Sequence, residues 1–98
     1  MAQNTNIVIP AETWTLLTDS DVTSITFQVL SQNLIYIKAT VGATPPSDTT
    51  GAIVYNFTQG EANAALADLF LGVSGANRVY AYAINAPSGV AKMMVSHA

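Results

Sequence analysis

The chain has 98 residues, of which 50% are hydrophobic and 9% charged, and its net charge is −3. This length suits one domain with a single core, and the low charge with many apolar residues argues against a disordered chain. Three cationic side chains are too few to neutralise a phosphate backbone, which argues against nucleic acid as a partner. No cysteine is present, so disulfide bonds, thiol catalysis and thiolate-bound metals are excluded.

The first third of the chain consists of short apolar runs separated by turn residues, a pattern typical of β-strands. Strands are expected at 7–9, 13–17 and 22–30. Pro10 ends the first of these because proline cannot donate to a β-ladder. In the third, Ile25, Phe27 and Val29 occupy alternate positions, so these side chains are predicted to face the core.

The middle of the chain predicts two strands, at 34–41 and 51–57, with a long loop at 42–50 between them. Ile35 and Ile37 are predicted to be buried because Lys38 lies on the opposite face of their strand. The loop contains two consecutive prolines, which fix φ at both positions. We therefore expect an ordered but irregular loop.

Residues 61–71 fit two structures. Ala62, Ala65, Leu66 and Leu69 have helical spacing, yet the segment also suits a strand that leads into a turn. We expect a strand at 61–66 and a helical turn at 67–71. Further strands are expected at 77–84 and 90–95, with a turn at 85–89.

These elements predict an all-β fold: a small antiparallel β-sandwich or barrel of seven to eight short strands, with at most one helical turn. The whole chain is expected to form one β domain, with residues 1–6 as a flexible N-terminal arm. Alternation predicts a core built from the following residues: Trp14, Leu16, Ile25, Phe27, Val29, Ile35, Ile37, Val54, Leu66, Leu69, Val79 and Ala81.

No catalytic, cofactor-binding or metal-binding residue is predicted. Asp19 and Asp21 could begin a calcium loop, but the further oxygen ligands of that motif are missing, so a plain turn is expected. The one histidine, His97, is next to the C-terminus and is expected to be frayed and solvated. The composition therefore predicts a protein that is not an enzyme.

Arg78 and three aromatic residues are candidates for contacts. The arginine is expected to pair within the chain, with Asp68 or Glu61, or alternatively across a subunit interface. Trp14, Tyr80 and Tyr82 could form a shelf for sugar stacking, but such aromatic residues more often serve packing or an interface.

Neutral polar residues and alanine replace charge on the predicted surface. Such a surface suits packing against other protein, because neutral groups cost less to desolvate than charges. A homo-oligomer is therefore expected. The polar start of the chain lacks the features of a signal peptide, and no apolar run is long enough to span a membrane, so no membrane partner is expected.

Several segments carry a resemblance to a known group of proteins. They are Trp14-Thr-Leu-Leu-Thr, Ile25-Thr-Phe-Gln, Ile35-Tyr-Ile-Lys-Ala-Thr-Val-Gly-Ala-Thr-Pro-Pro-Ser-Asp, Leu66-Ala-Asp-Leu-Phe, Gly75-Ala-Asn-Arg-Val-Tyr-Ala and Val95-Ser-His-Ala. From about Trp14 to the end, the chain resembles small virion structural proteins of siphophages and prophages. The resemblance implies a capsid decoration, or cement, protein that binds the outside of the shell as a homotrimer.

The resemblance also implies the partners and the location. The chain would bind copies of itself and the major capsid protein of the same phage, on the outer capsid surface, after synthesis in the host cytoplasm. A tail-fibre or baseplate module, or a receptor-binding module for carbohydrate, is the alternative. The resemblance supplies no site residues.

Two segments could reach a neighbouring protein: the expected arm at 1–6 and the loop at 40–50. We expect at least one of them to contact the capsid protein or an adjacent protomer. The candidate interface residues are Asn4, Thr5, Asn6, Thr44, Pro45, Pro46, Arg78, Tyr80 and Tyr82.

Overall fold

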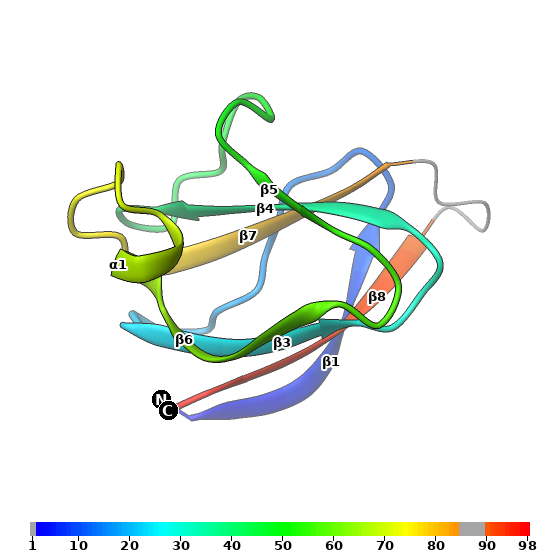
Figure 1. The fold of residues 1–98 in the computed structure, drawn as a ribbon. Helices are drawn as coiled ribbons and strands as arrows, with labels where there is room; N and C mark the ends of the chain where they lie inside the picture. Colours follow the sequence, from blue (N-terminus) through cyan, green and yellow to red (C-terminus); the bar gives the residue numbers. More distant parts are fainter. Residues whose placement is uncertain (1, 85–89) are drawn as a thin grey trace.

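The computed structural model describes residues 2–84 and 90–98, and these form two antiparallel four-stranded sheets (Figure 1). The strands are β1 (Gln3–Pro10), β2 (Thr15–Leu16), β3 (Ser24–Val29), β4 (Leu34–Thr40), β5 (Ile53–Tyr55), β6 (Gly60–Ala65), β7 (Arg78–Ile84) and β8 (Val90–His97). One short helix, α1 (Leu66–Leu69), follows β6. The predicted all-β fold is confirmed. The turn predicted at 85–89 lies outside the described residues.

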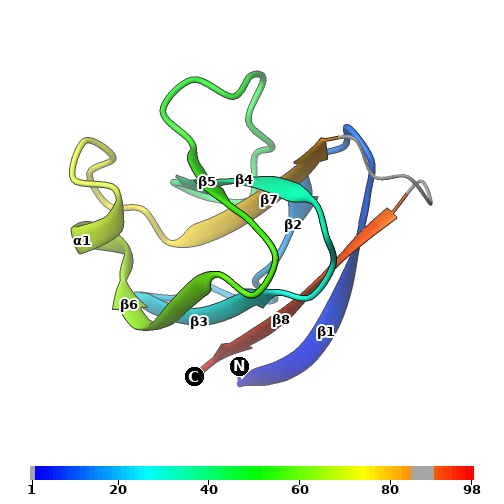
Figure 2. The ribbon, with the colours of Figure 1, turned by 45° about the vertical axis from the view of Figure 1, so that its right-hand side comes forward.

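The strand order is β1-β8-β3-β6 in the first sheet and β2-β7-β4-β5 in the second. The two sheets lie face to face, with the first below the second in the views of Figures 1 and 2. This arrangement is a β-sandwich, in which every second side chain of a strand points into the shared core.

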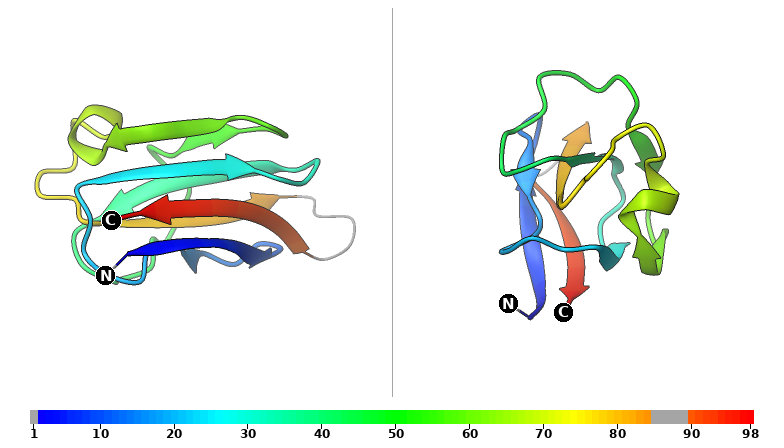
Figure 3. Two further views of the ribbon diagram at one scale, coloured as in Figure 1. Left: turned by 90° about the horizontal axis from the view of Figure 1, so that it is seen from below. Right: turned by 90° about the vertical axis from the view of Figure 1, so that its left-hand side faces the viewer.

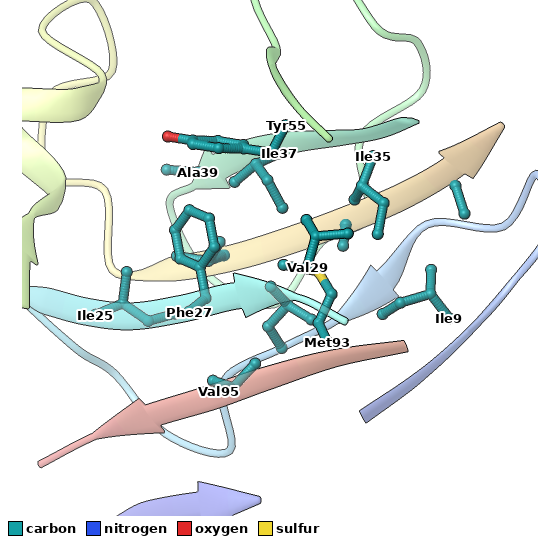
Figure 4. Close-up of a cluster of buried hydrophobic side chains, with 14 of the residues drawn as sticks. Ile9, Ile25, Phe27, Val29, Ile35, Ile37, Ala39, Tyr55, Met93 and Val95 are labelled. Atoms are coloured by element: carbon teal, nitrogen blue, oxygen red, sulfur yellow. The ribbon is translucent and has the colours of Figure 1, made fainter. Parts of the chain in front are cut away.

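The core confirms the predicted faces of β3, β4 and β7. Ile25, Phe27 and Val29 meet Ile35 and Ile37 between the sheets, as Figure 4 shows. Leu66, Val79 and Ala81 are also buried, as predicted. The core further includes residues that were not predicted: Ile9, Leu17, Val22, Ala39, Tyr55, Phe70, Ala83, Ala91, Met93 and Val95.

Four of the predicted core residues are not buried: one is exposed and three are half-buried. Val54 is 44% exposed, because Tyr55 is the residue of β5 that turns into the core. Trp14, Leu16 and Leu69 are only half-buried. At the start of the chain, Leu17 rather than Leu16 fills the core.

The flexible arm predicted at 1–6 is wrong for the described part of that segment. Residues from Gln3 onward belong to β1, which pairs with β8 along its whole length, from Gln3 opposite His97 to Pro10 opposite Val90. The backbone hydrogen bonds of this ladder hold the polar stretch in place, although most of its side chains are exposed.

The ambiguous segment folds as a strand followed by a helical turn, as predicted. β6 runs to Ala65, and α1 begins one residue earlier than expected, at Leu66. The Leu66 N–H donates to the Thr23 carbonyl over 2.9 Å, and the Leu66 side chain is buried. The helix therefore closes one end of the sandwich, at the left of Figure 1.

Candidate functional site

A row of aromatic rings crosses the outer side of the second sheet. Tyr36 of β4 lies opposite Tyr82 of β7, with ring centroids 6.3 Å apart. Trp14, which precedes β2, packs on Tyr82 at 5.1 Å. All three side chains are half-buried, so each ring keeps part of its surface in solvent.

Aliphatic side chains extend this row to a continuous patch. Val54 of β5 pairs with Tyr36, and Leu34 pairs with Ile84 on the same side of the sheet. Leu34 and Val54 are each 44% exposed. We call this patch the aromatic face; it consists of Trp14, Leu34, Tyr36, Val54, Tyr82 and Ile84. None of these six side chains is charged; Lys38, the next outward residue of β4, borders the face and is paired with Asp48. Such a surface suits contact with another protein.

Tyr80 was predicted as an interface residue, and here the prediction is wrong. It lies on the same side of the sheet, between Leu16 and Lys38 in the register, but it is only 3% exposed. Its ring is packed within the protomer and offers no accessible surface. Tyr82, by contrast, belongs to the aromatic face.

The loop between β4 and β5 rises from this side of the sandwich, as Figure 2 shows. At its base, the Gly42 N–H donates to Asn77 Oδ1 over 2.7 Å, and Lys38 Nζ lies 3.5 Å from Asp48 Oδ1. Thr44 and Pro45 are exposed and Pro46 is half-buried. The predicted ordered, irregular loop is confirmed, and these contacts hold its base beside the aromatic face.

Arg78 makes the expected ion pair within the chain, but with a different partner. Its Nε lies 2.9 Å from Asp21 Oδ1, and neither Asp68 nor Glu61 is involved. The aspartate side chain is 70% exposed, so this pair contributes at most about 1 kcal/mol to stability. Its geometric effect is to tie β7 to the connection that precedes β3.

His97 is not frayed, which corrects the sequence-based expectation. Its side chain is fully buried, and Nε2 lies 2.9 Å from Gln3 Oε1 and 3.3 Å from Asp19 Oδ1. Gln3 Nε2 in turn donates to the Leu17 carbonyl over 3.0 Å. This cluster joins both terminal strands to the segment after β2, so the imidazole has a structural role.

The first sheet has two open hollows on its surface. One, of about 290 Å³, is bordered by Gln28, Glu61 and Met94, and the other, of about 410 Å³, by Asn63, Ser96 and His97. Neither combines a nucleophile with a base within hydrogen-bonding distance. They resemble gaps between surface side chains more than a shaped catalytic cavity.

A hydrogen bond between Tyr55 and Glu61 links the two sheets. Burial raises the pKa of the Tyr55 hydroxyl well above its ordinary value, and the hydrogen bond that this hydroxyl donates to Glu61 Oε2 over 3.0 Å raises it further. The hydroxyl therefore stays protonated and acts as a fixed donor rather than as a base.

Within residues 2–84 and 90–98, no group of three His, Asp or Glu side chains could hold a metal ion, and no helix is long and apolar enough to cross a bilayer. Comparisons with family models, curated proteins and solved structures give no match to this chain.

Sequence reasoning found only part of the aromatic face. It selected Trp14 and Tyr82 but missed Leu34, Tyr36, Val54 and Ile84. Alternation had already placed Leu34 and Tyr36 on the side of β4 opposite the core. The register that aligns them with β7 and β5 is a long-range property and gives no local signal.

Proposed function

We propose that this chain is a non-enzymatic virion structural protein, a capsid decoration protein that binds the outside of a phage shell. The observation that carries the proposal is the aromatic face, which leaves half-exposed rings and aliphatic side chains on one side of a rigid sandwich. A cement protein needs such a contact surface and no chemistry of its own. The low charge supports close packing of copies.

In this proposal the aromatic face packs against copies of the same chain in a homotrimer. The six residues of the face are uncharged, and Lys38, which borders them on the same side of the sheet, is paired with Asp48. Three copies can therefore meet around an axis with little like-charge repulsion, and the rings lose their remaining exposed surface. The loop at 41–52 stands beside this face and remains free to contact the shell. Its exposed residues, Thr44 and Pro45, are then the footprint on the capsid protein.

The trimer contact is tested by placing a charge on the aromatic face. Val54→Lys should leave the fold intact, because the side chain is 44% exposed, but should lower the mass in native mass spectrometry below three times 10.3 kDa. It should also reduce the occupancy of shells that were assembled without the protein. Binding summed over linked copies is stronger than binding of one copy, so losing the trimer weakens attachment.

The matched control is Leu71→Lys, because Leu71 is 86% exposed and lies outside the aromatic face. This variant should keep the wild-type mass and the wild-type occupancy. A Val54→Lys protein with unchanged mass and occupancy would contradict the proposed contact. Wild-type protein that does not bind such shells at all would contradict the proposed function itself.

The alternative, a tail-associated or glycan-binding module, receives less support. A sugar site needs free amide or carboxylate side chains beside its exposed rings. Next to Tyr36 and Tyr82 lie the apolar side chains of Leu34, Val54 and Ile84, and the Asp48 carboxylate at the border of the face is paired with Lys38. A glycan array with purified protein would show specific binding if this alternative were correct.

A further inference from the structure

The edge of the first sheet leaves one set of backbone groups without a partner strand. β1 is the outermost strand, next to β8, as the left view of Figure 3 shows. The Lys92 carbonyl accepts from the Leu30 N–H, and the Lys92 N–H donates to Ser31 Oγ. Both backbone groups of Lys92 therefore point away from β1.

The direction of the Lys92 backbone N–H and C=O determines which backbone groups of β1 have no partner in β8. Val8 is its partner in the register, so the backbone N–H and C=O of Val8 point outward, away from β8. Alternation along the strand gives the same direction to Asn6 and Asn4. The Asn6 carbonyl accepts from the Thr5 hydroxyl over 3.4 Å, a contact that is compatible with this outward direction.

β1 lacks the usual protection of an edge strand. Natural edges are shortened, bulged or charged, since an open edge is a template for another strand. The other three edges follow this rule: β2 has two residues, β5 has three, and β6 carries Glu61 beside an irregular register with β3. β1 has eight residues and no charged side chain.

We propose that β1 pairs, antiparallel, with β1 of a second copy of this chain. One register pairs the outward groups of Asn4, Asn6 and Val8: Asn6 lies opposite Asn6 of the second copy, and Asn4 opposite its Val8. Three residue pairs then exchange two backbone hydrogen bonds each, and the two first sheets become one continuous sheet. Thr5 faces Ile7 of the second copy, a cross-strand pair of β-branched residues.

The second copy is the occupant that fits best, because the edge is complementary to itself. An uncharged strand meets its own copy without repulsion, and the two-fold register leaves none of the outward N–H groups of Asn4, Asn6 and Val8 unpaired. Val8, which is 51% exposed, gains a neighbour on the outer side of the sheet. The contact does not involve the aromatic face, so it does not depend on the proposed function.

Asn6→Pro tests the pairing without disturbing the ladder between β1 and β8. The Asn6 N–H points outward, so its loss removes hydrogen bonds across the new edge only, and Thr5 already has the extended backbone that precedes proline. In the Val54→Lys background, which removes the other proposed contact, we expect a mass of two chains. Adding Asn6→Pro should reduce it to one chain, whereas adding Asn6→Thr should not.

Single cysteines test the register directly, because the chain has none of its own. With Asn6→Cys the two Cα atoms lie about 5.5 Å apart across the two-fold axis, within disulfide range. With Asn4→Cys the two equivalent positions are displaced by about 14 Å along the strands. Mild oxidation should therefore cross-link Asn6→Cys almost completely and leave Asn4→Cys uncross-linked.

Two results would overturn the proposal. One is equal cross-linking of both cysteine variants, or of neither. The other combines two observations: the Val54→Lys protein has the mass of a single chain, and Asn6→Pro abolishes shell binding. Together they would show that the β1 edge pairs with a strand of the capsid protein and not with a second copy. Failure of wild-type protein to bind shells would affect only the proposed function and leave the β1 contact standing.

Discussion

At the scale of single residues, Tyr55 connects the core to the surface. Its ring meets Phe27 edge-on at 5.0 Å, and its hydroxyl donates to Glu61. A tyrosine whose pKa is raised in the folded state stays protonated where the unfolded chain has already ionised. Its contribution to stability is therefore complete below about pH 10 and falls as the pH rises further.

Tyr55→Phe removes both the hydrogen bond to Glu61 and the titration of the Tyr55 hydroxyl. At pH 7 we expect a loss of about 1.5–3 kcal/mol, because Glu61 loses a hydrogen bond donor. Above about pH 10 the difference in the free energy of unfolding between wild type and variant should narrow. Only the wild type loses stability there, because only its residue 55 can ionise. Urea unfolding at both pH values measures the change, and Tyr36→Phe, on the aromatic face, is the control. A gap that widens with pH would refute this role for Tyr55.

Alternation predicted single residues well where one side of a strand is polar. In β3, the polar side chains of Thr26 and Gln28 mark the outer side, so the inner side was clear. In β5 both sides are apolar, and the pattern could not tell Val54 from its neighbours. The burial of His97 had no local signal either, because it depends on Gln3 at the other end of the chain.

At the scale of elements, β3 and β6 approach so closely that one position accepts only glycine. A Cβ atom on Gly60 would lie 2.8 Å from the Gln28 Cα, which is backbone and cannot rotate away. The sequence gives no local signal for the strand against which this glycine packs.

Gly60→Ala should destabilise the protein by about 1–3 kcal/mol, because β3 and β6 must separate to admit the methyl group. Gly72→Ala is the matched control: no atom lies within 4 Å of its added Cβ, and we expect a change within about 0.5 kcal/mol. Thermal or urea unfolding of both variants measures the difference. Equal stability of the two would show that the strands are not in this close contact.

The terminal elements show why sequence reasoning failed at the edge of the sheet. Gln3 to Asn6 is polar and has none of the apolar alternation that marks a strand, so it was predicted to be an arm. Its strand structure comes from pairing with β8, whose residues are far away in the sequence. Asn4, Thr5 and Asn6 thus remain exposed interface candidates, but as part of a rigid edge.

At the scale of the whole molecule, two surfaces are suited to assembly. The aromatic face lies on the outer side of the second sheet, and the open edge of β1 belongs to the first. Three-fold contacts through the aromatic face and two-fold contacts through the β1 edge would join the copies into a continuous two-dimensional net. A net of this kind suits a layer that covers a shell, because each copy is held by several weak contacts at once.

The most direct test of the central claim is a cryo-electron microscopy map of particles from a phage or induced prophage that encodes this chain. We expect the sandwich as an additional density on the outer capsid surface, in groups of three, absent from particles made without the gene. Density for the sandwich in the tail, or no density for it anywhere on particles made with the gene present, would contradict the account.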